Sequence, residues 1–191
     1  TMETETIKSI IQSQWEETEE ELAGKKLIPR DGLQYVQPFL AHPNILAILG
    51  VRRCGKSVFS LLLSRELGGK VGYINFYDER LISCTSEDLE KIMQAFYELY
   101  STVDIVILDE IQLISGWELF VSRLRKTKKV IITGSNSKLL SGELATYLTG
   151  RHLDFTLYPL SFKEVLGFEL NIYSTKDRAK ARVALSDYVA G

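Results

Sequence analysis

The chain has 191 residues, of which 45% are hydrophobic and 25% are charged, and its formal net charge is −2. This is the composition of an ordinary globular protein with enough residues for one sizeable core. The near-neutral charge gives no electrostatic reason for the whole chain to bind nucleic acid, although it does not exclude a local basic patch. Cys54 and Cys84 lack the spacing of a metal site or disulfide framework, which favours a reducing, cytoplasmic location. No apolar run approaches the roughly 20 residues that span a bilayer, so no membrane partner is expected.

The first expected element is an amphipathic helix over residues 5–22, within an N-terminal extension of residues 1–24. Its apolar side chains recur at helical spacing, and five glutamates cluster behind them: Ile7, Ile10, Ile11, Trp15 and Leu22, then Glu16, Glu17, Glu19, Glu20 and Glu21. We interpret the acidic face as solvated, with a basic partner surface as the alternative. A short helix is expected next, over residues 31–40.

Residues 50–57 read Gly-Val-Arg-Arg-Cys-Gly-Lys-Ser and fit the pattern G-x-x-x-x-G-K-[ST]. They lie between an apolar run of strand length, residues 44–49, and an apolar helix, residues 57–67. Here a glycine-rich turn directs backbone N–H groups and the positive end of a helix at one spot, where phosphates bind. We expect Lys56 to reach the β- and γ-phosphates and Ser57 to ligate Mg²⁺. A turn that merely joins two elements is the alternative.

The residues predicted to contact the nucleotide are the loop, the first helical residue after Ser57, and one acid farther along the chain: Gly50, Val51, Arg52, Arg53, Cys54, Gly55, Lys56, Ser57, Val58 and Asp109. Cys54 is interpreted as a small filler of the loop, with a redox switch as the alternative.

Strands and helices alternate along the rest of the chain, which predicts an α/β fold with a parallel sheet and right-handed crossovers. The run at 103–108 is nearly all branched aliphatic, as expected of a strand buried on both faces. Ser86 is the expected N-cap of one helix. The expected strands are 70–77, 103–108, 129–133 and 153–158, and the expected helices are 86–100, 117–124, 137–148, one from 161 and one over 176–189.

Asp109 and Glu110 directly follow the aliphatic strand, at the sheet edge where open α/β folds bind ligands. We assign Asp109 to the metal and Glu110 to activation of the attacking water. Two solvated acids at a strand end are the alternative. Asp78 and Glu79 also follow a strand, and they are competing candidates for the catalytic base.

Two further polar residues are candidates because they follow later elements. Asn136 comes after the strand at 129–133, and its amide can bond the γ-phosphate or the water; a turn residue that caps the next helix is the alternative. Arg151 precedes the last strand, and a guanidinium on the γ-phosphate stabilises transition-state charge. A surface arginine at a helix end is the alternative for Arg151.

In this order the motifs resemble the AAA+ branch of P-loop ATPases. The finer resemblance is to a prokaryotic, largely archaeal and bacterial, group of predicted ATPases with an uncharacterised C-terminal domain. It covers roughly residues 25–191 and rests on Gly50-Val-Arg-Arg-Cys-Gly-Lys-Ser57, Tyr73-Ile-Asn-Phe-Tyr-Asp-Glu-Arg80, Leu108-Asp-Glu-Ile-Gln112, Thr133-Gly-Ser-Asn136 and Gly150-Arg151.

The resemblance implies a P-loop NTPase three-layer sandwich whose five parallel strands have the order 5-1-4-3-2, so that Asn136 lies between the two nucleotide motifs. It implies a core over residues 25–170 and a truncated helical lid that begins in residues 171–191. It also implies ATP, Mg²⁺ and a ring or other oligomer in which Arg151 acts in trans. A nucleic-acid or protein client would bind through the missing C-terminal domain.

We therefore expect an ATPase that binds ATP and hydrolyses it with Mg²⁺. A slowly hydrolysing signalling or defence switch and a DNA-acting motor are the alternatives. A GTPase lacks support, because the chain has no N-K-x-D motif and Asp109 does not begin D-x-x-G. A small-molecule kinase would be told apart by a phosphorylated acceptor as its product.

Overall fold

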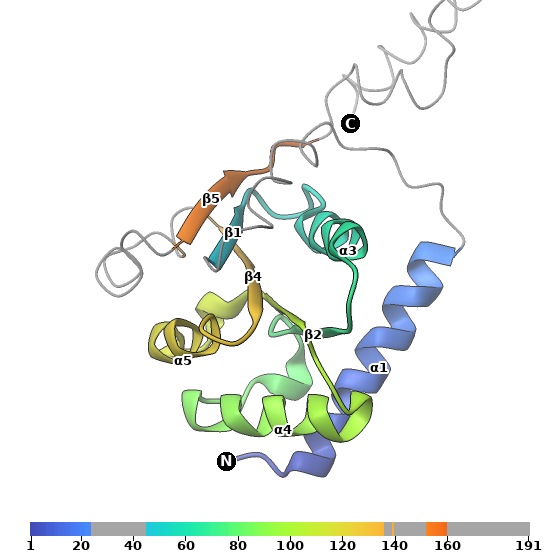
Figure 1. Cartoon of the computed structure of the whole chain (residues 1–191), viewed down its shortest axis with the longest axis vertical. Coiled ribbons are helices and arrows are strands. Elements are labelled where there is room, and N and C mark those ends of the chain that lie inside the picture. Colours follow the sequence, from blue (N-terminus) through green and yellow to red (C-terminus); the bar gives the residue numbers. More distant parts are fainter. Residues whose placement is uncertain (24–44, 136–138, 140–151, 160–191) are drawn as a thin grey trace, which may run out of the picture.

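The computed structural model describes residues 1–23, 45–135, 139 and 152–159 (Figure 1). Three short 3₁₀ turns, η2 (Glu79–Leu81), η3 (Ser86–Asp88) and η4 (Ile111–Leu113), lie among the longer elements. Those elements are α1 (Thr4–Ala23), β1 (Ile45–Leu49), α3 (Lys56–Leu67), β2 (Val71–Asn75), α4 (Leu89–Tyr100), β3 (Ile105–Asp109), α5 (Trp117–Leu124), β4 (Lys129–Gly134) and β5 (His152–Thr156).

The five strands form one parallel sheet in the order β2-β3-β4-β1-β5. The expected order is therefore confirmed, as is the α/β class. Every residue of β1 and β3 is buried, as predicted for β3 from its aliphatic sequence. Because all strands run the same way, the chain leaves β1, β2, β3 and β4 at one common edge of the sheet.

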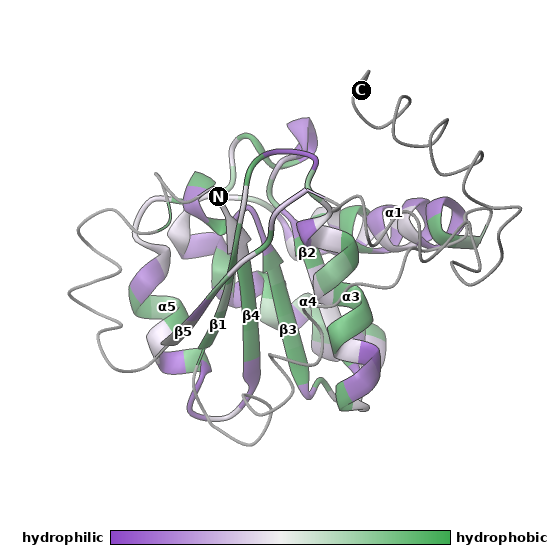
Figure 2. Ribbon diagram, turned by 90° about the horizontal axis from the view of Figure 1, so that it is seen from above, coloured by the Kyte–Doolittle hydropathy of each residue, from purple (hydrophilic) through white to green (hydrophobic). Residues whose placement is uncertain are grey.

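Helices cover both faces of the sheet and make three layers (Figures 1 and 2). Side chains of β1 alternate between the faces. Ile45, Ala47 and Leu49 join the apolar cluster that includes α4 and α5, whereas Leu46 and Ile48 join the cluster that includes α3. The hydrophobic strands thus lie between hydrophobic helix faces. This packing fixes the position of the loop that follows β1.

Helix α1 lies beside α4 and the free edge of β2 (Figure 1). The Gln14 side-chain amide replaces a neighbouring strand there: its Nε2 donates to the Asn75 carbonyl at 2.9 Å, and its Oε1 accepts from the Asn75 N–H at 2.9 Å. An exposed strand edge is a template for unwanted pairing, so this contact both anchors α1 and blocks the edge. Apolar α1 side chains pack in both clusters: Ile7, Ile10 and Ile11 in one, Trp15 and Leu22 against the other.

The start of the helix predicted at 86–100 differs from the expectation. Residues Ser86–Asp88 form the turn η3, and α4 begins at Leu89. Thr85, not Ser86, occupies the cap position, because the buried Asp88 carboxylate accepts hydrogen bonds from both the N–H and the hydroxyl of Thr85.

The helices expected at 31–40, 137–148, from 161 and at 176–189 lie outside the described residues, apart from Leu139, which is helical. So does the lid region over residues 171–191. Within the described part of the chain, no helix has the length and apolar character needed to cross a membrane.

Candidate active site

The loop after β1 carries the glycine-rich motif, and its conformation requires glycine at two positions. A Cβ on Gly50 would lie 2.5 Å from the carbonyl oxygen of Leu157, so only glycine fits between the loop and the end of β5. Gly55 has φ 90° and immediately precedes α3. Arg53 adopts φ 64°, a left-handed conformation that costs a non-glycine residue energy and is often found at functional sites.

Lys56 is buried, with 6% of its surface exposed, and its ammonium group folds back over the loop. Its Nζ donates to the carbonyl oxygens of Gly50, at 3.0 Å, and Val51, at 2.9 Å. It also lies 3.7 Å from Glu110 Oε1. A buried ammonium is thus placed between the glycine-rich loop and one of the two predicted acids.

Asp109 ends β3 with 1% of its surface exposed, and three hydroxyl groups converge on it. Its carboxylate accepts hydrogen bonds from Ser57 Oγ, Thr133 Oγ1 and, at 2.8 Å, the Tyr73 hydroxyl. Burial raises the pKa of Asp109 above its ordinary value, and these hydrogen bonds oppose that rise. Burial and the neighbouring Asp109 raise the pKa of Tyr73, which keeps its hydroxyl a donor. The two residues predicted to bind metal, Ser57 and Asp109, are therefore in direct contact.

Glu110 follows in the left-handed conformation, with φ 58°, which turns the chain out of β3. Its N–H donates to Thr133 Oγ1 at 3.0 Å, so one threonine contacts both consecutive acids. One carboxylate oxygen, Oε1, faces Lys56, and the other, Oε2, accepts a hydrogen bond from Gln112 Nε2. The side chain of Glu110 is 22% exposed, so it remains accessible from solvent.

Three residues at this site lie within the motifs that carry the resemblance, but the sequence indicates no role for them: Tyr73, Thr133 and Gln112. Thr133 had a usable signal, because it is a hydroxyl residue that follows the aliphatic run Val130–Ile132 near the end of a strand. Tyr73 and Gln112 gave no such signal. Their roles depend on strand register and on the turn η4, which the sequence does not reveal.

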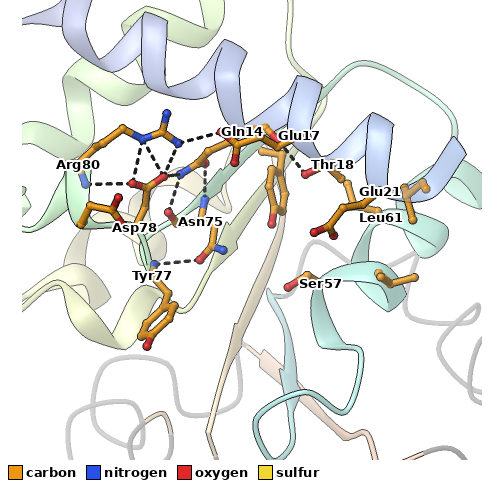
Figure 3. A pocket seen from close by; sticks show the side chains of 14 residues that line it. Gln14, Glu17, Thr18, Glu21, Ser57, Leu61, Asn75, Tyr77, Asp78 and Arg80 are labelled. Atoms are coloured by element: carbon orange, nitrogen blue, oxygen red, sulfur yellow. Dashed lines mark hydrogen bonds and ion pairs between the residues drawn. The ribbon is translucent and has the colours of Figure 1, made fainter. Parts of the chain in front are cut away.

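Asp78, a competing base, has other partners. Its carboxylate accepts from Arg80 Nη2 at 2.7 Å and from Gln14 Nε2 at 2.8 Å (Figure 3). The hydrogen bonds from Arg80 are the main cause that lowers the pKa of Asp78 to about 2. A general base works best with a pKa near the working pH, so these contacts disfavour Asp78 as the base. Glu79 follows Asp78 as the first residue of η2, and its side chain is exposed.

Two cavities border Ser57, whose hydroxyl contacts Asp109. One, of about 460 Å³, is lined by the loop arginines, Lys56, Glu110 and Gln112. Arg52 stacks over the exposed Tyr77 ring at its rim, with 4.3 Å between the guanidinium carbon and the ring centre. The other, of about 500 Å³, lies under α1 and reaches Ser57, and acidic side chains of α1 and η2 line it (Figure 3).

Residues 42–166 match the sequence pattern of a family described as an AAA domain. This is well over half of the chain. The chain belongs to the AAA domain family. This AAA domain is a nucleotide-binding P-loop module, and the glycine-rich loop, the buried lysine and the paired acids all lie within the matched residues.

Two relatives of this AAA domain carry no assigned activity. An uncharacterized protein of Methanocaldococcus jannaschii is 38% identical over 176 residues, which cover 88% of this chain and 39% of that protein. An uncharacterized protein of Haemophilus influenzae is 37% identical over 154 residues, which cover 74% of this chain and 38% of that protein. The chain thus spans about two-fifths of the length of these relatives.

The donor set of this AAA domain suits Mg²⁺ held partly by a substrate. The described residues contain no group of three or more His, Cys, Asp or Glu side chains that could enclose a metal alone. Mg²⁺ commonly takes one or two protein oxygens and completes its shell with water and phosphate, and Ser57 and Asp109 supply such oxygens. Asn136 and Arg151 lie outside the described residues.

Proposed function

We propose that this AAA domain binds ATP with Mg²⁺ and hydrolyses it. The observation that carries the proposal is the convergence of Lys56, Ser57, Asp109 and Glu110 at one sheet edge, from loops more than 50 positions apart. An ammonium group, a hydroxyl and two carboxylates with these contacts match the parts that phosphoryl transfer to water requires.

Each residue has a distinct role in this proposal. Lys56 exchanges the carbonyls of Gly50 and Val51 for phosphate oxygens, which are stronger partners because they are charged. Ser57 and Asp109 hold Mg²⁺, which neutralises charge on the phosphates. Glu110 lies next to Lys56, and its partly exposed carboxylate orients and deprotonates the attacking water.

The remaining roles extend the proposal to residues outside the described part of the chain. Asn136 follows Ser135, which lines the cavity beside Lys56, so we place the Asn136 amide at the γ-phosphate. Arg151 precedes β5 and is proposed to act in trans within a homo-oligomer, which would make hydrolysis depend on assembly.

Two other functions could use the same ATP site: a slowly hydrolysing switch and a DNA-acting motor. A signalling or defence switch would bind ATP tightly and hydrolyse it slowly, and turnover of many cycles per minute would disfavour it. A DNA-acting motor would need a nucleic-acid surface in the longer protein, which the uncharacterised C-terminal domain proposed for this group could supply.

The test compares ATP binding and phosphate release for the wild type, Lys56→Ala and Glu110→Gln. We expect Lys56→Ala to weaken ATP binding about 100-fold, because it removes charge-assisted hydrogen bonds. We expect Glu110→Gln to keep binding and to lose turnover by about 10²–10⁴-fold. Lys126→Ala and Glu87→Gln, at exposed positions, serve as matched controls. Unchanged turnover in Glu110→Gln would transfer the base to Asp78 or Glu79.

A further inference from the structure

Gln112 contacts Glu110 from within the turn η4, two residues along the chain. Its Nε2 donates a hydrogen bond to Glu110 Oε2. The orientation of the amide follows from chemistry, because the reverse orientation would place the amide oxygen against a carboxylate oxygen. Both side chains line the cavity of about 460 Å³ that also contains Lys56.

The other end of the Gln112 amide is held by packing. Its Oε1 atom is buried and has no hydrogen-bond partner among the residues that the structure describes. It lies against Gly134, where a Cβ would come within 2.3 Å of it. The missing side chain of Gly134 therefore leaves the space that the Gln112 amide occupies, and the amide is wedged between the end of β4 and Glu110.

The two oxygens of the Glu110 carboxylate consequently have different surroundings. Oε2 is bound by Gln112, whereas Oε1 faces the Lys56 ammonium at 3.7 Å, on the side where the γ-phosphate is proposed to lie. A carboxylate anchored through one oxygen presents the other in a defined direction. Such preorganisation matters, because a misplacement of about 1 Å at a reacting centre can cost 10²-fold in rate.

We propose that Gln112 is a positioning residue that fixes the Glu110 carboxylate, so that Oε1 faces the attacking water. This inference rests on the proposed function. The role given to Gln112 is to act through Glu110, to which it donates its hydrogen bond.

The experiment measures kcat, KM and ATP affinity for Gln112→Met, which keeps the length of the side chain and removes the donor. We expect kcat to fall about 10- to 100-fold with KM and ATP affinity unchanged within about twofold. Gln112→Glu should lower kcat at least as far, because it sets a carboxylate against Glu110. The matched control is Gln94→Met, which removes a Gln–Glu hydrogen bond on the exposed face of α4 and should leave kcat unchanged.

A double-mutant cycle separates positioning from packing. In the Glu110→Gln background, Gln112→Met should have no further effect on the residual single-turnover rate, because the group it positions is gone. Equal effects of Gln112→Met in both backgrounds, or an unchanged kcat in the single variant, would overturn the proposal. If the wild type itself releases no phosphate from ATP, the proposed function fails as well. If the wild type hydrolyses ATP and Gln112→Met has the same kcat, only this inference is overturned.

Discussion

Thr133 joins the two acids of the site through one hydroxyl group. It donates to the Asp109 carboxylate and accepts from the N–H of Glu110. Both Thr133 and Asp109 are buried, so neither partner could recover its hydrogen bond from bulk water. The acids are therefore held together from β4, an element separate in sequence from the strand that carries them.

Replacing Thr133 with valine keeps the shape of the side chain and removes both hydrogen bonds. Because buried polar groups would be left unsatisfied, we expect the free energy of unfolding to fall by about 1–3 kcal/mol. Urea denaturation at neutral pH checks this. Thr127→Val, at an exposed position, is the control and should change stability by less than about 0.5 kcal/mol. Equal stability of Thr133→Val and the wild type would contradict the role given to this hydroxyl.

Asp78, at the same edge of the sheet, makes a pH-dependent contribution to the free energy of unfolding. The hydrogen bonds from Arg80, then that from Gln14, lower its pKa from 3.8 to about 2. A carboxylate whose folded pKa is depressed stabilises the fold above its unfolded pKa, and this contribution disappears as the pH falls through the folded value. The contribution is therefore full above about pH 4 and is lost toward pH 2, with a size of about 2 kcal/mol.

We therefore expect Asp78→Asn to lower the free energy of unfolding by about 2 kcal/mol at pH 6, with the difference from the wild type shrinking between pH 4 and pH 2. Chemical denaturation across this range measures it, and Glu87→Gln, on an exposed side chain, is the reference substitution. A difference that stays constant with pH would show that Arg80 and Gln14 do not stabilise the charged form of Asp78.

At the scale of elements, α1 closes the open edge of the sheet. Gln14 is 4% exposed and satisfies both backbone groups of Asn75, while its Nε2 also contacts Asp78. Asn75 pairs in register with Asp109 on β3, so α1 is one strand away from the acid proposed to hold Mg²⁺. Helix α1 thus stabilises the strand next to the site as well as covering apolar surface.

Replacing Gln14 with leucine should expose this dependence. Because the Asn75 N–H and carbonyl lose their partner, we expect a loss of about 1–3 kcal/mol in stability and faster hydrogen exchange at the Asn75 amide. Gln12→Leu, one position on the exposed side of the same helix, is the matched control. Protection of the Asn75 amide that is equal in Gln14→Leu and in the control would mean that α1 does not pair with β2.

At the scale of the whole molecule, a parallel sheet brings distant loops to one edge. The glycine-rich loop, Asp109 and Glu110 could be predicted from sequence, because their residue types and their places after apolar strands have a direct physical meaning. The strand order could be predicted only through the resemblance to AAA+ proteins. The contact of Ser57 with Asp109 then follows from the two strands ending at the same edge.

The supporting residues could not be predicted in the same way. Tyr73 and Thr133 reach Asp109 because β2 and β4 flank β3 in a particular register. Gln14 comes from the N-terminal helix α1, far from β2 in the sequence. Nothing in the sequence around Gln14 indicates that its amide will hydrogen-bond the backbone of β2. The roles of such residues depend on which side chains the fold brings into contact, and local sequence patterns do not reveal these contacts.

The central claim is that Lys56, Ser57 and Asp109 form a site for Mg²⁺ and a nucleoside triphosphate. The most direct measurement is a crystal structure with a non-hydrolysable ATP analogue and Mg²⁺. We predict that Lys56 Nζ leaves the Gly50 and Val51 carbonyls for the β- and γ-phosphate oxygens, and that the metal replaces the hydrogen bond between Ser57 and Asp109. An analogue bound elsewhere, with Lys56 still on its carbonyls, would contradict the claim.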